Sequence, residues 1–513
     1  MSARSLMVLG TASHVGKSIL TAALCRILAN EGFRVAPFKA QNMSLNSAAT
    51  PDGREIGRAQ ALQAEACRIA PRAEMNPILI KPSSDRSAQI VVMGRVWGQV
   101  TAADYHQRRV EELFPVVVDA YRALAAEHNI IVLEGAGSPA EINLKEHDIV
   151  NMRMAQAAGA ECLLVGDIDR GGVFASLLGT LELLDPAERA RVRGFVVNKF
   201  RGDIRLLEPG ISMIESRVGV RCAGVVPYLP EIGLDDEDSV SMDSRPAAWE
   251  IEPASPSRRL RVAVARFPYL SNFTDFDPLQ AEPSVSLAFV DTPEALREAD
   301  LAILPGSKQT LDDLDWLRRR GLEPSLRRFR GGAGILGICG GMQMLGRTIE
   351  DPTGAESCGI PRVESGLGVL PIRTVLRTDK VTRMASGTVV TSLFGGAMAG
   401  SSFHGYEIHL GQTVYEEDAQ AFAEIQRCGD FAPMPDGAAG SNAFGTYIHG
   451  LFRDDGFRHR FLAAARNACG LDPALELAGI EAERERRLDR LANHVRGSLD
   501  MNLIFECLGV APR

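Results

Sequence analysis

The stretch from Leu6 to Gly32, LMVLGTASHVGKSILTAALCRILANEG, is the most informative part of the N-terminal half of this sequence. A short apolar run leads into a glycine loop, and apolar residues at helical spacing follow until Gly32. A strand, a loop and a helix that starts at Gly16-Lys17-Ser18 form the arrangement that cradles phosphates. Backbone N–H groups and the helix dipole hold the anion, the lysine neutralises it, and the hydroxyl binds Mg²⁺. The stretch therefore predicts a phosphate-binding loop.

The loop departs from the usual spacing of its class. Five residues separate Gly10 from Gly16, one more than usual, and Thr11 takes the first glycine's place in the strict register. This departure suits a variant phosphate loop of the dethiobiotin synthetase type. The alternative is a glycine turn with a surface lysine, which the strand–helix context disfavours.

Further apolar runs alternate with amphipathic stretches along the chain. IIVLEGAG, ECLLVGDI, GFVVNK and CAGVVPY are too uniformly apolar for strands with one wet face, so they predict buried strands. Such alternation predicts a mostly parallel sheet with helices on both faces. After about residue 260, LRVAVARF, VSLAFV, LAILPG and GILGIC restart the pattern. The predicted fold class is therefore α/β, with two doubly wound domains.

Changes in composition predict the domain boundaries. Residues 235–259, DDEDSVSMDSRPAAWEIEPASPSRR, are acidic, rich in proline and serine, and without an apolar period, which indicates a linker. We therefore expect one domain at 1–234, a second at 260–455, and a C-terminal helical cap at 456–513 that packs on the second domain.

Composition also limits the class of protein. The net charge of −9 and the lack of a basic stripe speak against a nucleic-acid partner. No apolar run approaches the ~20 residues that cross a bilayer, and the N-terminus does not read as a signal peptide, so we expect a soluble, cytoplasmic protein without membrane partners. Nine cysteines without CxxC spacing argue against disulfides and a zinc site, and Cys25, Cys67 and Cys162 indicate core thiols. The oligomeric state stays open.

Polar residues at predicted strand ends are candidates for a metal–nucleotide site. Glu134, Asp167 and Asp169 lie where open α/β sheets bind ligands, and with Ser18 any of them could hold Mg²⁺. Asn198 ends another strand and could touch the adenine. Solvated strand ends and a turn asparagine are the alternatives.

The stretch GICGGMQMLG, 337–346, sets one thiol among glycines. Glycines on both sides of Cys339 allow a sharp strand-to-helix turn that exposes the sulfur above the sheet, as in a nucleophile elbow. The N–H of Gly340 could donate to an oxyanion, and Gly306 in LPGSKQT could supply a second donor. The alternative is a small buried hydrophobe.

A thiol nucleophile needs a base, and three histidines are candidates for it. His449 in GTYIHGLF lies at a strand-to-loop junction, and His404 and His409 compete with it. We expect Cys339 and His449 to act together.

A series of segments in order along nearly the whole chain closely resembles the glutamine-dependent cobyric acid synthase family: GTASHVGKS, VAPFKAQNMSLNS, GREIGRAQ, MNPILIKPSSD, EGAGSPAEINL, DIDRGGVFAS, VVNKFRGD, SNFTDFDPL, ILPGSKQT, GICGGMQMLG and GYEIHLG. The resemblance implies an ATP-dependent amide-forming domain similar to dethiobiotin synthetase, followed by a class I, triad-type glutamine amidotransferase domain. Its substrates would be glutamine and adenosylcobyrinic acid a,c-diamide, amidated at carboxylates b, d, e and g, with ATP and Mg²⁺ as cofactors.

The resemblance makes Cys339 the nucleophile and His449 the base. Ordinary triad glutaminases place a glutamate two residues after the histidine, where this chain has Leu451. The third member is therefore absent or supplied from elsewhere, with Glu407 as a candidate.

Three rival functions stay open at this level. Cobyrinic acid a,c-diamide synthase has the same two domains, but APFKAQNMSLNS with GREIGRAQ favours cobyric acid synthase. A regulatory ATPase with an inactive glutaminase-like module and a cobamide-binding protein without turnover are the others. We expect KAQNMSLNS, 39–47, and KPSSDRSAQ, 81–89, to face the corrin ring. The order of amidations and the ammonia path stay open.

Overall fold

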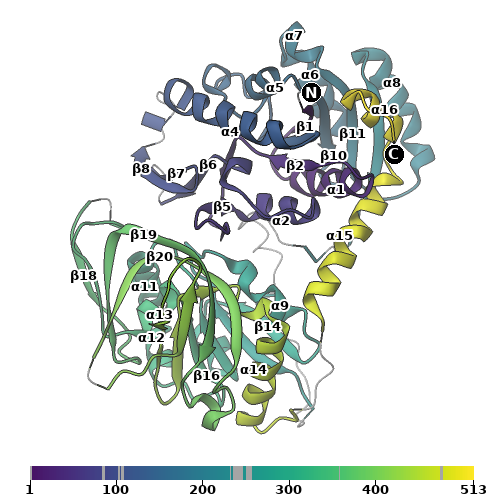
Figure 1. Cartoon of the computed structure of the whole chain (residues 1–513). Helices are drawn as coiled ribbons and strands as arrows, with labels where there is room; N and C mark the ends of the chain where they lie inside the picture. The colour runs from purple at the N-terminus through teal and green to yellow at the C-terminus, as the bar shows by residue number, and fades with distance from the viewer. Residues whose placement is uncertain are drawn as a thin grey trace.

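The computed structural model describes residues 3–83, 87–101, 104–105, 109–230, 233–234, 246–249, 257–357, 359–416, 418–473 and 478–512. Two α/β domains lie one above the other, and a long C-terminal helix leads from the second domain back to the first (Figure 1). The predicted fold class is confirmed.

The sheet of the first domain is wholly parallel, with the order β12-β11-β10-β1-β9-β2. Leu6 and Val8 of β1 face one hydrophobic cluster, and Met7 and Leu9 face another, because successive side chains of a strand point to opposite sides. Both faces are therefore buried. The strands are β1 (Arg4–Gly10), β2 (Val35–Phe38), β9 (Ile130–Glu134), β10 (Glu161–Asp167), β11 (Val192–Phe200) and β12 (Arg221–Pro227).

Helices cover each face of this sheet. The first face lies under α4 (Phe114–Glu127), α5 (Met152–Ala158), α6 (Val173–Leu183) and α8 (Glu208–Val218). The second lies under α1 (Lys17–Asn30) and α2 (Arg58–Ala66), and the short α7 is Pro186–Arg189. Cys25, Cys67 and Cys162 are buried in these layers, which confirms the prediction of core thiols.

The C-terminal helices correct one expectation. We expected the whole segment after residue 455 to pack on the second domain, and only α14 (Asp455–Ala468) does so. α15 (Ile480–Arg496) and α16 (Met501–Leu508) return to the first domain and cover the second face of its sheet. The buried stripe of α15 consists of Leu488, Leu491 and Val495. These side chains cover part of the second face of the sheet, which must be buried because a parallel sheet carries helices on both faces.

The second domain contains a mostly parallel sheet with the order β14-β13-β15-β16-β24-β23. Its strands are β13 (Leu260–Ala265), β14 (Val285–Val290), β15 (Leu301–Leu304), β16 (Gly334–Ile338), β23 (Ala438–Ala439) and β24 (Ala443–Thr446). Its helices, besides α14, are α9 (Asp277–Gln280), α10 (Pro293–Arg297), α11 (Thr310–Arg319), α12 (Glu323–Arg327) and α13 (Gly340–Leu345). Among the described helices of the chain, none is long and apolar enough to span a membrane.

A second, mostly antiparallel sheet completes this domain, and it lies on the side that faces the first domain (Figure 1). Its strands are β17 (Thr348–Asp351), β18 (Arg362–Ser365), β19 (Ile372–Val389), β20 (Ser402–Tyr415), β21 (Ala423–Arg427), β22 (Met434–Asp436) and β25 (Ile448–His449). Two small sheets of the first domain lie on the facing side: β3 (Gln41–Met43) with β6 (Ile78–Pro82), β7 (Ser87–Val92) and β8 (Arg95–Thr101), and β4 (Ser47–Ala49) with β5 (Glu55–Gly57).

The predicted linker, 235–259, falls mostly outside the described residues. Two of its described residues lie against β14: the Pro246 carbonyl accepts from the N–H of Phe289 (2.9 Å), and Trp249 Nε1 donates to the Ser286 carbonyl (3.1 Å). The boundaries at 234 and 260 stay predictions.

Replacing Arg26 tests the docking of α15. This side chain is fully buried in α1, and its guanidinium pairs with Glu485 and with Asp489 (2.8 Å), both on α15. Arg26→Ala removes charge-assisted hydrogen bonds, and we expect it to lower the free energy of unfolding by about 1–3 kcal/mol. The carboxylates are half-exposed and regain water, which keeps the loss below that of a fully buried pair. Thermal and urea denaturation measure it.

Arg122→Ala is the matched control, because Arg122 is exposed on α4 and pairs with Asp119 of its own helix at the surface (3.3 Å). We expect it to change stability by less than about 0.5 kcal/mol. Equal effects of the two substitutions would contradict the importance of the α1–α15 ion pairs.

Candidate active sites

The predicted phosphate loop joins β1 to α1, and its backbone is held from the neighbouring strands. Gly16 has φ 97°, and a Cβ on it would lie 2.2 Å from Asn198 Nδ2, so only glycine fits. Asn198 Nδ2 donates to the Val15 carbonyl (2.8 Å), and the Thr11 N–H donates to the Val165 carbonyl (2.9 Å). Asn198 thus holds the loop, and its contact with adenine stays a prediction.

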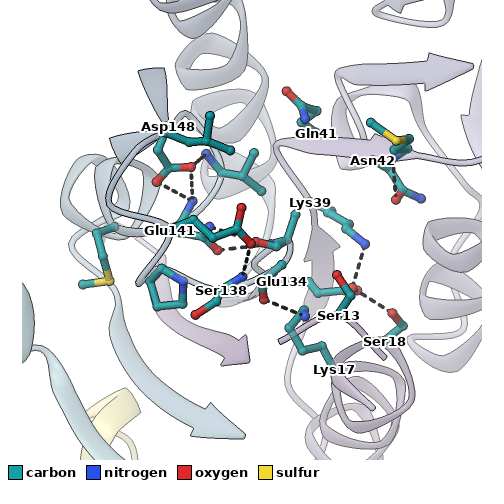
Figure 2. A pocket seen from close by; sticks show the side chains of 18 of the residues that line it. Ser13, Lys17, Ser18, Lys39, Gln41, Asn42, Glu134, Ser138, Glu141 and Asp148 are labelled. Carbon is teal, nitrogen blue, oxygen red and sulfur yellow. Dashed lines mark hydrogen bonds and ion pairs between the residues drawn. The ribbon is translucent and has the colours of Figure 1, made fainter. Parts of the chain in front are cut away.

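Lys17, Ser18 and Glu134 meet at the edge of a cavity (Figure 2). Lys17 Nζ donates to the carbonyls of Ala12 (2.9 Å) and Gly137 (3.0 Å), which keeps the ammonium between the loop and the end of β9. Ser18 Oγ donates to Glu134 Oε1 (2.8 Å). The loop lysine and hydroxyl therefore lie where the sequence predicts them, beside the acidic strand end.

Glu134 is almost fully buried, and two residues that sequence reasoning missed satisfy its carboxylate. Lys39 Nζ lies 2.8 Å from Oε1, and Gln63 Nε2 donates to Oε2 (2.6 Å). A buried carboxylate is stable only with such partners. Lys39 belongs to the predicted corrin-side segment, but no spacing in the sequence links it or Gln63 to Glu134.

The cavity measures about 1140 Å³ and extends from the phosphate loop to the loops after β2 and β9. That volume exceeds the range of about 300–1,000 Å³ usual for one small ligand. Gln41, Asn42 and Met43 line it, as does Ile142. Met43 and Ile142 are both more than half exposed, so the cavity joins a polar floor to apolar side chains.

The four predicted metal ligands do not come together. Asp167 Oδ2 accepts from Lys199 Nζ (2.8 Å), and Asp169 pairs with Arg201 (3.2 Å), while β1 separates their strand from that of Glu134. Lys199 also donates to the His14 carbonyl (2.8 Å), so Asp167 supports the loop indirectly. In the part of the chain that the structure describes, no three acidic, histidine or cysteine side chains gather as metal ligands.

Ser18 and Glu134 nevertheless fit Mg²⁺. Their oxygens lie 2.8 Å apart beside Lys17 at the cavity. Mg²⁺ takes oxygen ligands and usually binds only one or two protein groups, with phosphate oxygens and water completing its shell. Asp167 and Asp169 do not join this pair.

Cys339 lies at the turn between β16 and α13. Its φ of 51° and ψ of −111° are strained for a residue with a side chain, as the predicted nucleophile elbow requires. Its N–H donates to the Thr446 carbonyl at the end of β24 (2.8 Å). Gly341 makes room for the turn, since a Cβ there would lie 1.9 Å from the Leu304 carbonyl oxygen.

The two glycines predicted as oxyanion donors lie beside this turn. A Cβ on Gly306 would lie 2.9 Å from His449 Cε1, and one on Gly340 would lie 3.0 Å from the Ser307 nitrogen. The end of β15, the start of α13 and the histidine ring therefore converge on one place.

His449 is buried and pairs with Asp275. Its Nδ1 lies 2.6 Å from Asp275 Oδ2, and the N–H of Gly450 donates to Asp275 Oδ1 (3.0 Å). Burial alone would lower the pKa of His449, but the Asp275 carboxylate and the Cys339 side chain raise it to about 10. Cys339, His449 and Asp275 thus form a connected set.

The prediction that Glu407 is the third member of the triad is wrong. Its carboxylate accepts from Arg427 Nη2 (2.9 Å) and lies 3.2 Å from His409 Nε2. Burial would raise its pKa, but these two partners lower it to about 2. Asp275 holds His449 instead, and it lies 174 residues away in the sequence, beyond the reach of any local spacing.

The competing histidines have other partners. The exposed His404 lies 3.1 Å from Asp454 Oδ2, and His409 bonds Glu407 and the Gly411 carbonyl (2.7 Å). Of the three histidines, His449 is the one that pairs with Asp275 and whose pKa Cys339 raises; the Cys339 thiol itself donates to the Ile408 carbonyl (3.6 Å).

Two family models match the chain in the order of its domains. The model of the CobQ/CobB/MinD/ParA nucleotide binding domain matches residues 6–240, and that of the CobB/CobQ-like glutamine amidotransferase domain matches residues 261–457.

Curated proteins named cobyric acid synthase are similar over the whole length. The chain is 46% identical to that of Moorella thermoacetica, covering 99% of this chain and 98% of the relative. It is 48% identical to that of Sorangium cellulosum, with both chains covered completely. It is 49% identical to that of Desulforudis audaxviator, covering 99% of this chain and all of the relative.

The His449–Asp275 pair predicts a titration. At neutral pH His449 lies below its raised pKa and keeps its proton. Asp275→Asn removes the negative charge, so we expect the pKa to fall from about 10 toward the ordinary value of about 6.5. NMR titration of the histidine ring signals measures it, with His449→Gln for assignment. Glu407→Gln should leave the His449 signal unchanged, and an unchanged signal in Asp275→Asn would contradict the assignment.

Proposed function

Because this chain belongs to the cobyric acid synthase family, we propose that it uses ATP and glutamine to amidate carboxylates b, d, e and g of adenosylcobyrinic acid a,c-diamide. Its glutamine amidotransferase domain makes it a glutamine-dependent ligase. One observation carries the finer proposal: a connected Cys339–His449–Asp275 set and a phosphate-loop cavity occur in one chain.

In the second domain, Cys339 attacks the side-chain amide carbon of glutamine as a thiolate, with its proton on His449. The N–H groups of Gly340 and Gly306 stabilise the oxyanion that forms. His449 then gives the proton to the amide nitrogen, ammonia leaves, and a glutamyl thioester remains on Cys339. Water hydrolyses the thioester to glutamate, with His449 as base. Asp275 keeps the ring oriented and supports its charge.

In the first domain, the substrate carboxylate must first be activated, because oxide is a poor leaving group. A carboxylate oxygen attacks the γ-phosphorus of ATP, ADP leaves, and an acyl phosphate forms, while Lys17 neutralises charge on the transferred group. Ammonia then displaces phosphate to give the amide. Ser18 and Glu134 would hold Mg²⁺, which neutralises phosphate charge when bound.

The size and lining of the cavity support a second, larger substrate beside the nucleotide. The exposed Met43 and Ile142 suit the apolar face of a macrocycle, and Gln41 and Asn42 suit its amide and carboxylate arms. We therefore keep 39–47 as a corrin-side segment. In 81–89, residues 84–86 lie outside the described part, and Lys81 bonds Glu55 (2.6 Å) at the domain interface instead of lining the cavity.

Mass spectrometry tests the substrate. Adenosylcobyrinic acid a,c-diamide incubated with ATP, Mg²⁺ and glutamine should acquire successive amidations up to four. Turnover of cobyrinic acid in its place would support the rival a,c-diamide synthase activity. No amidation of either would support a regulatory or binding role.

Cys339→Ser should separate the two halves. A serine hydroxyl beside His449 is a far weaker nucleophile than a thiolate, so we expect glutamine-driven synthesis to fall by about 10³-fold or more. Synthesis from added ammonia at alkaline pH should stay within about twofold, because the phosphate-loop cavity is untouched. Glutamate release and amide formation measure the two. Retained glutamine use would make Cys339 a buried thiol only.

Lys17→Ala should abolish both routes. Without this charge the phosphoryl transfer loses its main protein-borne stabilisation, and we expect amide formation to fall at least about 10²-fold from either glutamine or ammonia. ADP release with saturating ATP measures it. Near-normal turnover from ammonia would contradict the phosphate-loop assignment.

A further inference from the structure

Helix α2 touches both candidate sites. Gln63 of this helix donates to Glu134 Oε2 (2.6 Å) and to the Ser18 carbonyl (3.3 Å) at the phosphate loop. Arg58, its first residue, contacts Tyr406 of the second domain. Five residues at about 1.5 Å each separate the two side chains along the helix axis. One short, rigid element therefore links the sites.

At the start of α2, the side chain of Tyr406 links Arg58 to the ring of His449. Arg58 Nη2 donates to the Tyr406 hydroxyl (2.6 Å), and its guanidinium lies 5.5 Å from the centre of the tyrosine ring. His449 also lies beside that ring, at 5.6 Å between centres and 24° between planes, and the Tyr406 hydroxyl donates to the Ser47 carbonyl (3.2 Å). All three side chains are buried, so the charge-assisted hydrogen bond forms away from water.

The same region of the first domain also holds the segment that carries Asp275. The N–H of Ser47 donates to Asn272 Oδ1 (2.9 Å), and the N–H of Phe273 donates to Asn46 Oδ1 (3.2 Å). Asn272 has a positive φ of 54° and precedes the turn of 3-10 helix with Asp275. Both members of the His449–Asp275 pair are thus supported from the first domain.

We propose that Arg58 is a positioning residue for the glutaminase site: it holds Tyr406 flat against His449, and α2 ties this contact to Glu134 at the phosphate loop. The inference rests on the proposed function of Cys339 and His449. It makes glutamine hydrolysis depend on a residue of the other domain. Because Arg58 does not touch glutamine in this scheme, its loss affects kcat more than KM.

The first experiment compares substitutions of Arg58 in the full-length protein. A displaced base can cost about 10²-fold, so we expect Arg58→Met to lower kcat for glutamine hydrolysis by about 10- to 100-fold, with KM changed less than about threefold. Arg58→Lys should restore part of kcat, because an ammonium can still donate to Tyr406. Tyr406→Phe, which keeps the ring but loses the hydroxyl, should resemble Arg58→Met.

Two controls keep the outcomes distinct. Ammonia-driven synthesis should stay within about twofold in Arg58→Met, since only the second site is misaligned. Arg68→Met, which changes an arginine just after α2 that bonds Asn30, should leave both rates unchanged. Parallel loss of both rates in Arg58→Met would overturn the inference in favour of a general role in folding.

Cys339→Ser, measured alongside, separates this inference from the proposed function. If Cys339→Ser loses hydrolysis and Arg58→Met keeps it, the positioning role is overturned and the proposed function stands. If Cys339→Ser keeps hydrolysis, the proposed function itself fails.

The link through α2 has its own measurement. We expect ATP with Mg²⁺ to raise the rate of glutamine hydrolysis, and Gln63→Leu to reduce that rise, because the leucine no longer bonds Glu134. Equal rates with and without ATP, or an undiminished rise in Gln63→Leu, would overturn the link.

Discussion

Both faces of the parallel sheet in the first domain must be covered, and the rest of the architecture depends on this constraint. α1 and α2 cover part of the second face, and α15 and α16 return from the far end of the chain to cover the remainder. The chain therefore begins and ends in the first domain, with both termini beside the same sheet (Figure 1). The second domain is attached at two points, which restricts how far it can move from the first.

Because the second domain can move only a little relative to the first, polar groups can be buried between the two domains. Glu55 pairs with Lys81 of its own domain and with Lys380 of the other, each at 2.6 Å. Burial lowers the pKa of Lys380 to about 7, although Glu55 opposes the change. Ion pairs of this kind tolerate little displacement, because separating them leaves a buried charge without its partner. Arg58 and Tyr406 lie in the same interface, so a small displacement of one domain relative to the other would shift the ring that packs against His449.

The two proposed reactions need this proximity for a chemical reason. Ammonia is nucleophilic only while unprotonated, and an acyl phosphate reacts with water if amidation is slow. Coupling the position of the glutaminase base to the phosphate loop would limit glutamine hydrolysis when no acyl phosphate is present. α2 provides the physical connection, since Gln63 and Arg58 lie on one helix.

The sequence alone indicated most strands of the two central sheets, the phosphate loop and the glycine-flanked turn at Cys339, because glycine spacing and apolar periodicity act over a few residues. Glu134 was predictable in the same way, as a carboxylate at a strand end. The sequence did not predict the antiparallel sheet that contains β19 and β20, and it left three histidines as candidates for the base. Three contacts follow from the three-dimensional fold and not from any local pattern: Asp275 holds His449, Asp167 pairs with Lys199, and α15 packs on α1. The Asp275 and α15 contacts join residues 174 and 463 positions apart. Helical periodicity reveals a buried stripe on α15 but does not say which sheet it covers, since any apolar face satisfies it; that choice requires the whole fold.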